Sequence, residues 1–143
     1  MRIFACQHKT RETVWIPELM KHANGARHLK QVLIAAPKPA KEAAHLSRLI
    51  DREPHDEADR AVTVPSGGNR ADFVFLTKEQ LSRRYPDVPL AGVPERGGAG
   101  LVIASDDLDV TEKALGASGI RSGGSICVPP AAANGMLLAF VKG

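Results

Sequence analysis

The sequence predicts an α+β domain made of two similar halves, and three observations support this. A short apolar segment recurs in the chain, a helical pattern follows each occurrence, and further short strands follow each helix. The chain of 143 residues is long enough to build one domain with a buried core. We therefore expect two copies of a strand, a helix and two strands, with room for one more short strand after each helix.

The first copy begins at residues 32–36, a short apolar run rich in β-branched residues that is typical of a buried strand. A helix follows, with Pro39 in its first turn, where a helix tolerates proline. Its expected apolar face consists of Ala43, Leu46, Leu49 and Ile50. Further strands are predicted at 63–65 and 72–77, with a polar loop between them.

The second copy begins at residues 101–105, which match the first strand at an offset of 69 residues. Acidic residues crowd 106–109, where the helix dipole favours them, and Gly119 is the expected end of that helix. The last two strands, at 127–129 and 136–141, follow their counterparts at an offset of 64 residues. The shorter offset predicts a five-residue surface insertion after the first helix, within residues 51–60.

Three prolines and four glycines lie between residues 85 and 100, which indicates the boundary between the copies. We expect an N-terminal arm at 1–28 and one domain at 29–143. Within this domain, the first module is 29–84, the linker 85–98 and the second module 99–143.

The predicted insertion carries a cluster of acidic and histidine side chains: Asp51, Glu53, His55, Asp56, Glu57 and Asp59. These residue types bind cations, but the spacing lacks the glycine pivot of a calcium loop. We therefore expect a solvated surface segment instead of a metal site.

Composition excludes several classes of protein. Apolar residues make up 43% and charged residues 24%, a globular balance, and no apolar run approaches the roughly 20 residues of a membrane helix. Residues 1–50 hold nine Lys and Arg against three Asp and Glu, whereas 51–143 hold ten against thirteen. No nucleic-acid-binding pattern accompanies this basic end. Two cysteines, Cys6 and Cys127, show no zinc spacing, so we expect a cytoplasmic protein in which Cys127 is a core residue.

The N-terminal arm concentrates the residues with chemical potential. Cys6 and His8 lie two positions apart beside Glu12, which raises the hypothesis of a cysteine nucleophile, although such a site also needs an orienting group. Trp15, the only tryptophan, and Pro17 are expected to anchor the arm against the sheet or a partner subunit.

A turn is predicted just before the first strand. Asn24 and Gly25 accept positive φ with little strain, so this segment directs the chain into the strand. A ligand-contacting role for His22 or Asn24 is the alternative, and Arg27 and His28 are placed where they can line the mouth of a polar site.

The tandem duplication resembles the vicinal oxygen chelate superfamily, which includes glyoxalase I, bleomycin-resistance proteins and extradiol dioxygenases. Residues 128–140 (VPPAAANGMLLAF) are similar to its closing strand, and residues 4–18 (FACQHKTRETVWIPE) with 22–26 (HANGA) resemble a bacterial glyoxalase-like-domain family. The resemblance implies paired, cup-shaped mixed sheets. It also suggests the C-terminal half of longer members, which carry another paired module upstream.

The resemblance further implies a divalent metal held in the cup by one ligand from the first and last strand of each module. The matching positions hold Gln31, Phe75, Gly100 and Ala139. Only Gln31 offers an oxygen donor, so we expect no cofactor, and a metal only where a site is completed between subunits.

Three hypotheses follow. The first is a glyoxalase-like domain that lacks the superfamily metal and binds a small molecule in the cup, or serves as a non-catalytic half. The second is a metal-dependent lyase or dioxygenase-like enzyme whose site combines Gln31 with residues such as His8, Glu12 and His22 across a dimer. The third is an arm that mediates homodimerisation or docks on a separately encoded N-terminal half. None of them involves a nucleic acid or a membrane.

Overall fold

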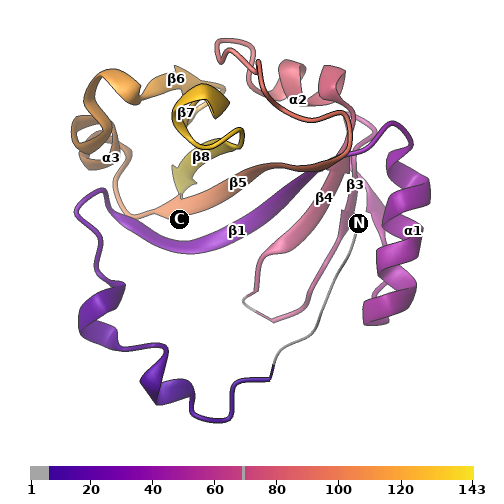
Figure 1. Ribbon diagram of the computed structural model, residues 1–143, viewed down its shortest axis with the longest axis horizontal. Helices are drawn as coiled ribbons and strands as arrows, with labels where there is room; N and C mark the ends of the chain where they lie inside the picture. Colours follow the sequence, from indigo (N-terminus) through magenta and orange to yellow (C-terminus); the bar gives the residue numbers. More distant parts are fainter. Residues whose placement is uncertain (1–6, 69) are drawn as a thin grey trace.

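The computed structural model describes residues 7–68 and 70–143, and in these residues each half of the chain forms the same series of elements (Figure 1). The first half consists of β1 (Ala26–Ala35), α1 (Pro39–Ile50), β2 (His55–Asp56), β3 (Val62–Val64) and β4 (Asp72–Leu76). The second consists of β5 (Gly97–Ser105), α3 (Leu108–Leu115), β6 (Ile120–Ser122), β7 (Ser125–Val128) and β8 (Leu137–Lys142). The short extra strands after the helices are β2 and β6.

These strands form one open mixed sheet in the order β2-β3-β4-β1-β5-β8-β7-β6. The first strand of each half runs parallel to the last strand of the same half, and β1 pairs with β5 antiparallel at the centre. The two halves are therefore related by an approximate two-fold axis between β1 and β5. The predicted α+β class and the paired β-α-β-β-β modules are confirmed.

Helices α1 and α3 cover one face of the sheet. Leu46 of α1 packs with Phe75 and Val64, while α3 packs against Ile126 and Phe140. Pro39 is the first residue of α1, as predicted. The predicted apolar face of α1 is wrong at one position, since Leu49 is 59% exposed.

The start and end of α3 are set by its neighbours in sequence. The Asp107 carboxylate accepts hydrogen bonds from the amides of Asp109 and Val110, which is a standard N-cap. The α-helix ends at Leu115, where Gly116 adopts a positive φ, and a 3₁₀ turn, η3 (Gly116–Ser118), continues the helical stretch to its C-cap at the predicted Gly119.

The opposite face, which we call the inner face, carries a core that joins both halves. Alternation along the strands places Leu33, Val74, Val102, Leu137 and Ala139 there. A helix that the sequence analysis missed, α2 (Lys78–Arg84), and the segment after it pack on this core through Leu81, Tyr85, Val88 and Val93. Figure 1 shows α2 and this segment above β1 and β5, at the top of the view.

We had expected the acidic insertion to be a solvated surface segment, and this is wrong for its last part. That part folds back onto α2, where the Arg84 guanidinium donates hydrogen bonds to Glu57 and Asp59. Only 20% of the Arg84 side chain and 29% of each carboxylate side chain are exposed. The hydrogen bonds to Arg84 hold the pKa of Asp59 below its ordinary value of 3.8.

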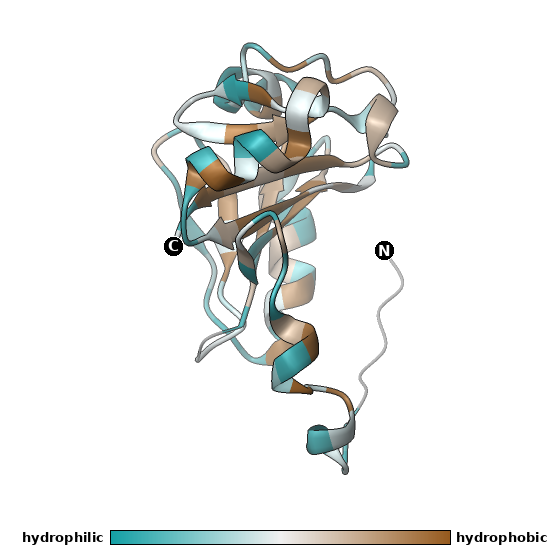
Figure 2. Ribbon diagram, turned by 90° about the vertical axis from the view of Figure 1, so that its left-hand side faces the viewer, coloured by the Kyte–Doolittle hydropathy of each residue, from teal (hydrophilic) through white to brown (hydrophobic). Residues whose placement is uncertain are grey.

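The described part of the arm, from residue 7 to the start of β1, extends away from the sheet (Figures 1 and 2). It contains two short 3₁₀ turns, η1 (Arg11–Thr13) and η2 (Pro17–Met20), neither of which buries a residue. No helix in the described residues is long and apolar enough to cross a membrane.

A tight turn joins the arm to β1. Gly25, at φ +75°, donates its amide to the carbonyl of His22, and the Asn24 side chain accepts from the amide of Ala26. The buried Thr111 hydroxyl then donates to the Asn24 carbonyl at 2.7 Å, which fixes the turn on α3. The turn predicted from Asn24-Gly25 is confirmed.

Candidate functional site

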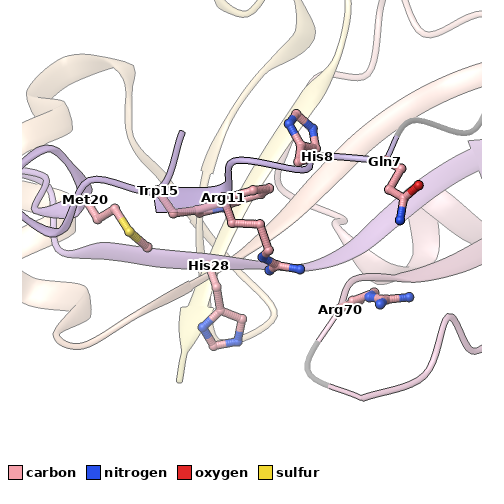
Figure 3. Close-up of a pocket in the computed structure, with 7 residues that line it drawn as sticks. All are labelled: Gln7, His8, Arg11, Trp15, Met20, His28 and Arg70. Atoms are coloured by element: carbon pink, nitrogen blue, oxygen red, sulfur yellow. The ribbon is translucent and has the colours of Figure 1, made fainter. Parts of the chain in front are cut away.

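An open pocket of about 890 Å³, which we call the arm pocket, lies between the arm and the first half of the sheet, and all of its lining residues are exposed (Figure 3). Most of its lining comes from the arm, and the remainder comes from β1 and the β3–β4 connection. The lining residues are Gln7, His8, Arg11, Trp15, Met20, His28 and Arg70.

The arm pocket and the inner-face core occupy different ends of β1. His28 lies near the start of this strand, whereas Leu33 and Ala35, which pack in the inner-face core with α2, lie near its end. Because Leu81, Tyr85 and neighbouring apolar side chains already occupy the inner face there, the space for a ligand lies beneath the arm instead.

Trp15 organises the arm side of the pocket. The Arg11 guanidinium lies 4.7 Å from the centre of the Trp15 ring, a cation–π contact, and the His8 ring meets Trp15 edge-on at 5.1 Å. Figure 3 shows Arg11 extending from the arm toward β1. These contacts hold a cationic side chain over the pocket while 42% of Trp15 remains exposed.

The electrostatic character of the arm pocket is basic. Its lining includes two arginines and two histidines and contains no Asp or Glu. Ion pairs among the described residues use Arg27, Arg84, Arg96 and Arg121, together with Lys78, but neither Arg11 nor Arg70. Two permanently charged groups therefore line the same cavity, and no carboxylate of the described residues pairs with either of them.

The fold was compared with known proteins. No protein-family model matches the sequence, and no curated protein matches it. Among solved structures, the methylmalonyl-CoA epimerase of Mycobacterium tuberculosis is similar, with a TM-score of 0.58 and 16% identity over 86% of this chain and 92% of that one. A variant of the Streptomyces coelicolor methylmalonyl-CoA epimerase bound to 2-nitronate-propionyl-CoA has a TM-score of 0.51 and 12% identity, over 82% and 97% of the two chains.

These epimerases belong to the glyoxalase, bleomycin resistance and dioxygenase superfamily. The chain has the vicinal oxygen chelate fold. At these identities the comparison establishes the fold alone, so the chemistry of this protein has to be argued from its own residues.

One of the four superfamily ligand positions must be reassigned. In the second half, the ligand position Ala139 pairs with Val102, and the equivalent pair in the first half is Val74 with Leu33. Phe75, the next residue, packs against α1 on the helix-covered face. The sequence offset of 64 is wrong here because the β7–β8 connection, which contains η4 (Pro130–Ala132), is one residue longer than the β3–β4 connection. A shift of one residue moves a strand side chain to the opposite face.

The corrected positions do not fit a metal ion. Val74 and Ala139 are apolar, and an added Cβ on Gly100 would lie 2.7 Å from the Leu137 carbonyl oxygen, so no donor side chain fits there. Gln31, opposite Val102, offers a single neutral amide. Divalent cations in proteins need several oxygen, nitrogen or sulfur ligands. Within residues 7–68 and 70–143, no group of three or more His, Cys, Asp or Glu side chains is placed to hold one.

The structure separates the candidate residues of the arm. His8 lines the arm pocket together with His28, whereas Glu12 and Gln31 are not among its lining residues. His22 lines a smaller hollow of about 210 Å³ beside Asp106. The side-chain oxygen of Asn24 is used by the turn, and Cys6 lies outside the described residues.

The sequence analysis missed Gln7, Arg11, Met20 and Arg70 as pocket residues. The available signal was the excess of basic residues in the first third of the chain, which favours an anionic partner but does not locate a site. Trp15 was expected to anchor the arm against the sheet or a partner subunit. It is 42% exposed and its ring contacts Arg11 and His8 of the arm itself, so anchoring on the sheet is not confirmed, and anchoring on a partner stays a prediction.

Cys127 and Tyr85 are buried in the inner-face core and are not suited to catalysis. Burial raises the pKa of the Cys127 thiol to about 11 and that of the Tyr85 hydroxyl to about 12. Both groups therefore stay protonated at neutral pH, and the expectation that Cys127 is a core residue agrees with its complete burial.

Proposed function

We propose that this protein is a vicinal oxygen chelate-fold domain that binds a small organic molecule in the arm pocket without the superfamily's metal. The observation that carries the proposal is the arm pocket itself, a cavity of about 890 Å³ with an exposed tryptophan and two arginines that form no ion pair among the described residues. Its volume lies in the range of small-molecule sites, roughly 300–1,000 Å³. The unsuitable side chains at Gln31, Val74, Gly100 and Ala139 support binding that does not depend on a metal.

The only tryptophan of the chain reports on this pocket directly, which makes the test simple. Untagged protein is incubated with zinc, nickel, manganese and iron(II), dialysed and assayed for metal content. In parallel, small molecules are screened by Trp15 emission with and without a chelator. Because the fold neighbours are named for a CoA thioester, CoA thioesters belong in this screen beside simple organic acids and phosphate esters.

We expect less than stoichiometric metal, and ligand binding that is the same in the presence of the chelator. Stoichiometric metal that survives dialysis, or binding that the chelator abolishes, would overturn the metal-free proposal. It would instead favour an enzyme whose site is completed between subunits, with His8, Glu12 and His22 as the first ligands to substitute.

A second candidate role is self-association through the arm. Five large apolar side chains of the arm are exposed, namely Val14, Trp15, Ile16, Leu19 and Met20. Exposed apolar residues gathered in one segment mark protein interaction sites. We expect a homodimer that the double variant I16E/L19E converts to a monomer, measured by light scattering after size exclusion. Wild-type protein that stays monomeric at roughly 100 μM, about the dissociation constant of a weak dimer, would rule out this role.

A further inference from the structure

The arm pocket is held together by few polar contacts of its own. Within the described residues, no hydrogen bond or ion pair joins residues 7–21 to the rest of the chain. Arg11 belongs to the arm and Arg70 to the β3–β4 connection, so the two positive charges approach the cavity from separate elements. A negative group placed between them would supply the missing link.

The geometry of Arg11 favours such a group. Its guanidinium is already oriented by the Trp15 ring at 4.7 Å, so less conformational entropy is lost when its N–H groups bind an anion. Guanidinium groups bind carboxylates and phosphates through paired, charge-assisted hydrogen bonds. Gln7, His8 and His28 add further side chains that can donate hydrogen bonds around the same cavity.

The volume and apolar lining indicate that the ligand is more than an inorganic anion. A cavity of about 890 Å³ has room for a molecule with an organic body. Trp15 and Met20, which are 42% and 45% exposed, provide the apolar surface beside the charges. Sulfur and aromatic groups both pack well on aromatic rings.

We propose that the arm pocket binds an aromatic organic anion, with its acidic group between Arg11 and Arg70 and its ring against Trp15 and Met20. This inference rests on the proposed function, since it names the ligand class of that pocket. A carboxylate, a phosphate or a sulfonate satisfies the same chemistry. Because the anion contacts both the arm and the β3–β4 connection, its binding also fixes the arm on the sheet.

Two matched probes test the role of the charge. Anilinonaphthalene sulfonate is an aromatic anion, and N-phenyl-1-naphthylamine is its analogue without the sulfonate. Each probe is titrated into the full chain, and binding is followed by energy transfer from Trp15, the only tryptophan. The variants are R11Q and R70Q, with R48Q as a control that removes the same charge from an exposed position on α1.

We expect the sulfonate to bind wild type and R48Q with the same affinity and to bind R11Q and R70Q at least about tenfold more weakly, as the loss of a charge-assisted hydrogen bond predicts. The neutral analogue is expected to bind more weakly than the sulfonate and equally to all four proteins. Phosphotyrosine and benzoate as competitors distinguish phosphate from carboxylate as the preferred acidic group.

Equal affinity of the sulfonate for R11Q, R70Q and wild type would overturn the inference, as would tighter binding of the neutral analogue. In either case the pocket still binds small molecules, and the proposed function stands without a requirement for an anion. If no compound changes the emission of Trp15 or accepts energy from it, both the inference and the proposed function fail.

Discussion

Arg84 joins α2 to a segment that lies 25 residues earlier in the chain. Its guanidinium donates to Glu57 at 2.6 Å and to the two oxygens of Asp59 at 2.6 and 2.9 Å, in a largely buried site. R84M leaves two half-buried carboxylates without a counter-ion. We expect it to lower the free energy of unfolding by about 2 kcal/mol at pH 7, measured by urea denaturation. R83M, at an exposed position on the same helix, is the control and should change it by less than about 0.5 kcal/mol.

The same network predicts how stability depends on pH. Because Arg84 lowers the pKa of Asp59 in the folded protein, the carboxylate stays charged to a lower pH there than in the unfolded chain. Its stabilisation is therefore present above the unfolded value of 3.8 and is lost as the pH falls through the lower folded pKa. The stability difference between wild type and R84M should narrow below about pH 4. A difference that stays constant from neutral to strongly acidic pH would contradict this explanation.

Gly25 is required by both its backbone conformation and its surroundings. It has φ +75°, and a Cβ there would lie 2.9 Å from the Ser105 hydroxyl oxygen, which is hydrogen-bonded to buried Thr111. Gly124 has a similar φ of +78° with open space around it, so G124A measures the backbone strain alone. We expect G25A to lower the thermal stability more than G124A, by about 1 kcal/mol at the midpoint. Equal losses in the two variants would show that the steric contact with Ser105 is unimportant.

At the scale of elements, α2 is the piece that fills the inner face. Leu81 is 1% exposed and packs in the core shared by both halves. L81A should therefore lower the free energy of unfolding by about 3 kcal/mol, through lost apolar burial and the cavity that remains. L49A makes the same change on α1 at a side chain that is 59% exposed, and it should cost less than about 0.5 kcal/mol. Similar decreases in the free energy of unfolding for both variants would mean that Leu81 of α2 does not contribute to the inner-face core.

The elements that sequence reasoning recovered are those with strong periodicity. The strands of both halves and the helices α1 and α3 follow from apolar spacing and end signals. Helix α2 was missed because its seven residues span only two turns next to a segment rich in proline and glycine. Its capping box was nevertheless readable, since Thr77 and Gln80 are three residues apart and cap each other reciprocally.

The candidate site was harder to predict, for two physical reasons. A single extra residue in the β7–β8 connection moves the ligand position from Phe75 to Val74, and such a change cannot be read from similarity between short strands. The arm pocket combines residues 7–20 with His28 and Arg70, which only the folded chain brings together. The sequence showed the basic character of the arm but not the surface that it faces.

At the scale of the whole molecule, the two halves share one core and should unfold together. Leu33 and Val74 of the first half pack in the same cluster as Ala139 and Cys127 of the second. Unfolding one half alone would expose apolar surface of the other, which the hydrophobic effect opposes. The thiol of Cys127, completely buried and with a pKa raised to about 11, is a natural reporter of this opening.

We expect Cys127 in a C6S background to react with a thiol reagent at pH 8 only through global unfolding. V74C in a C6S/C127S background places a thiol of similar size at an equally buried position in the first half. If the halves unfold as one unit, the free energy of opening derived from each labelling rate should agree with the free energy of unfolding of the same variant in urea, within about 0.5 kcal/mol. Mass spectrometry identifies the labelled residue. Faster labelling of Cys127 than of V74C, after correction for the stability of each variant, would show that the second half opens independently. The Cys127 thiol would then become accessible while the first half stays folded.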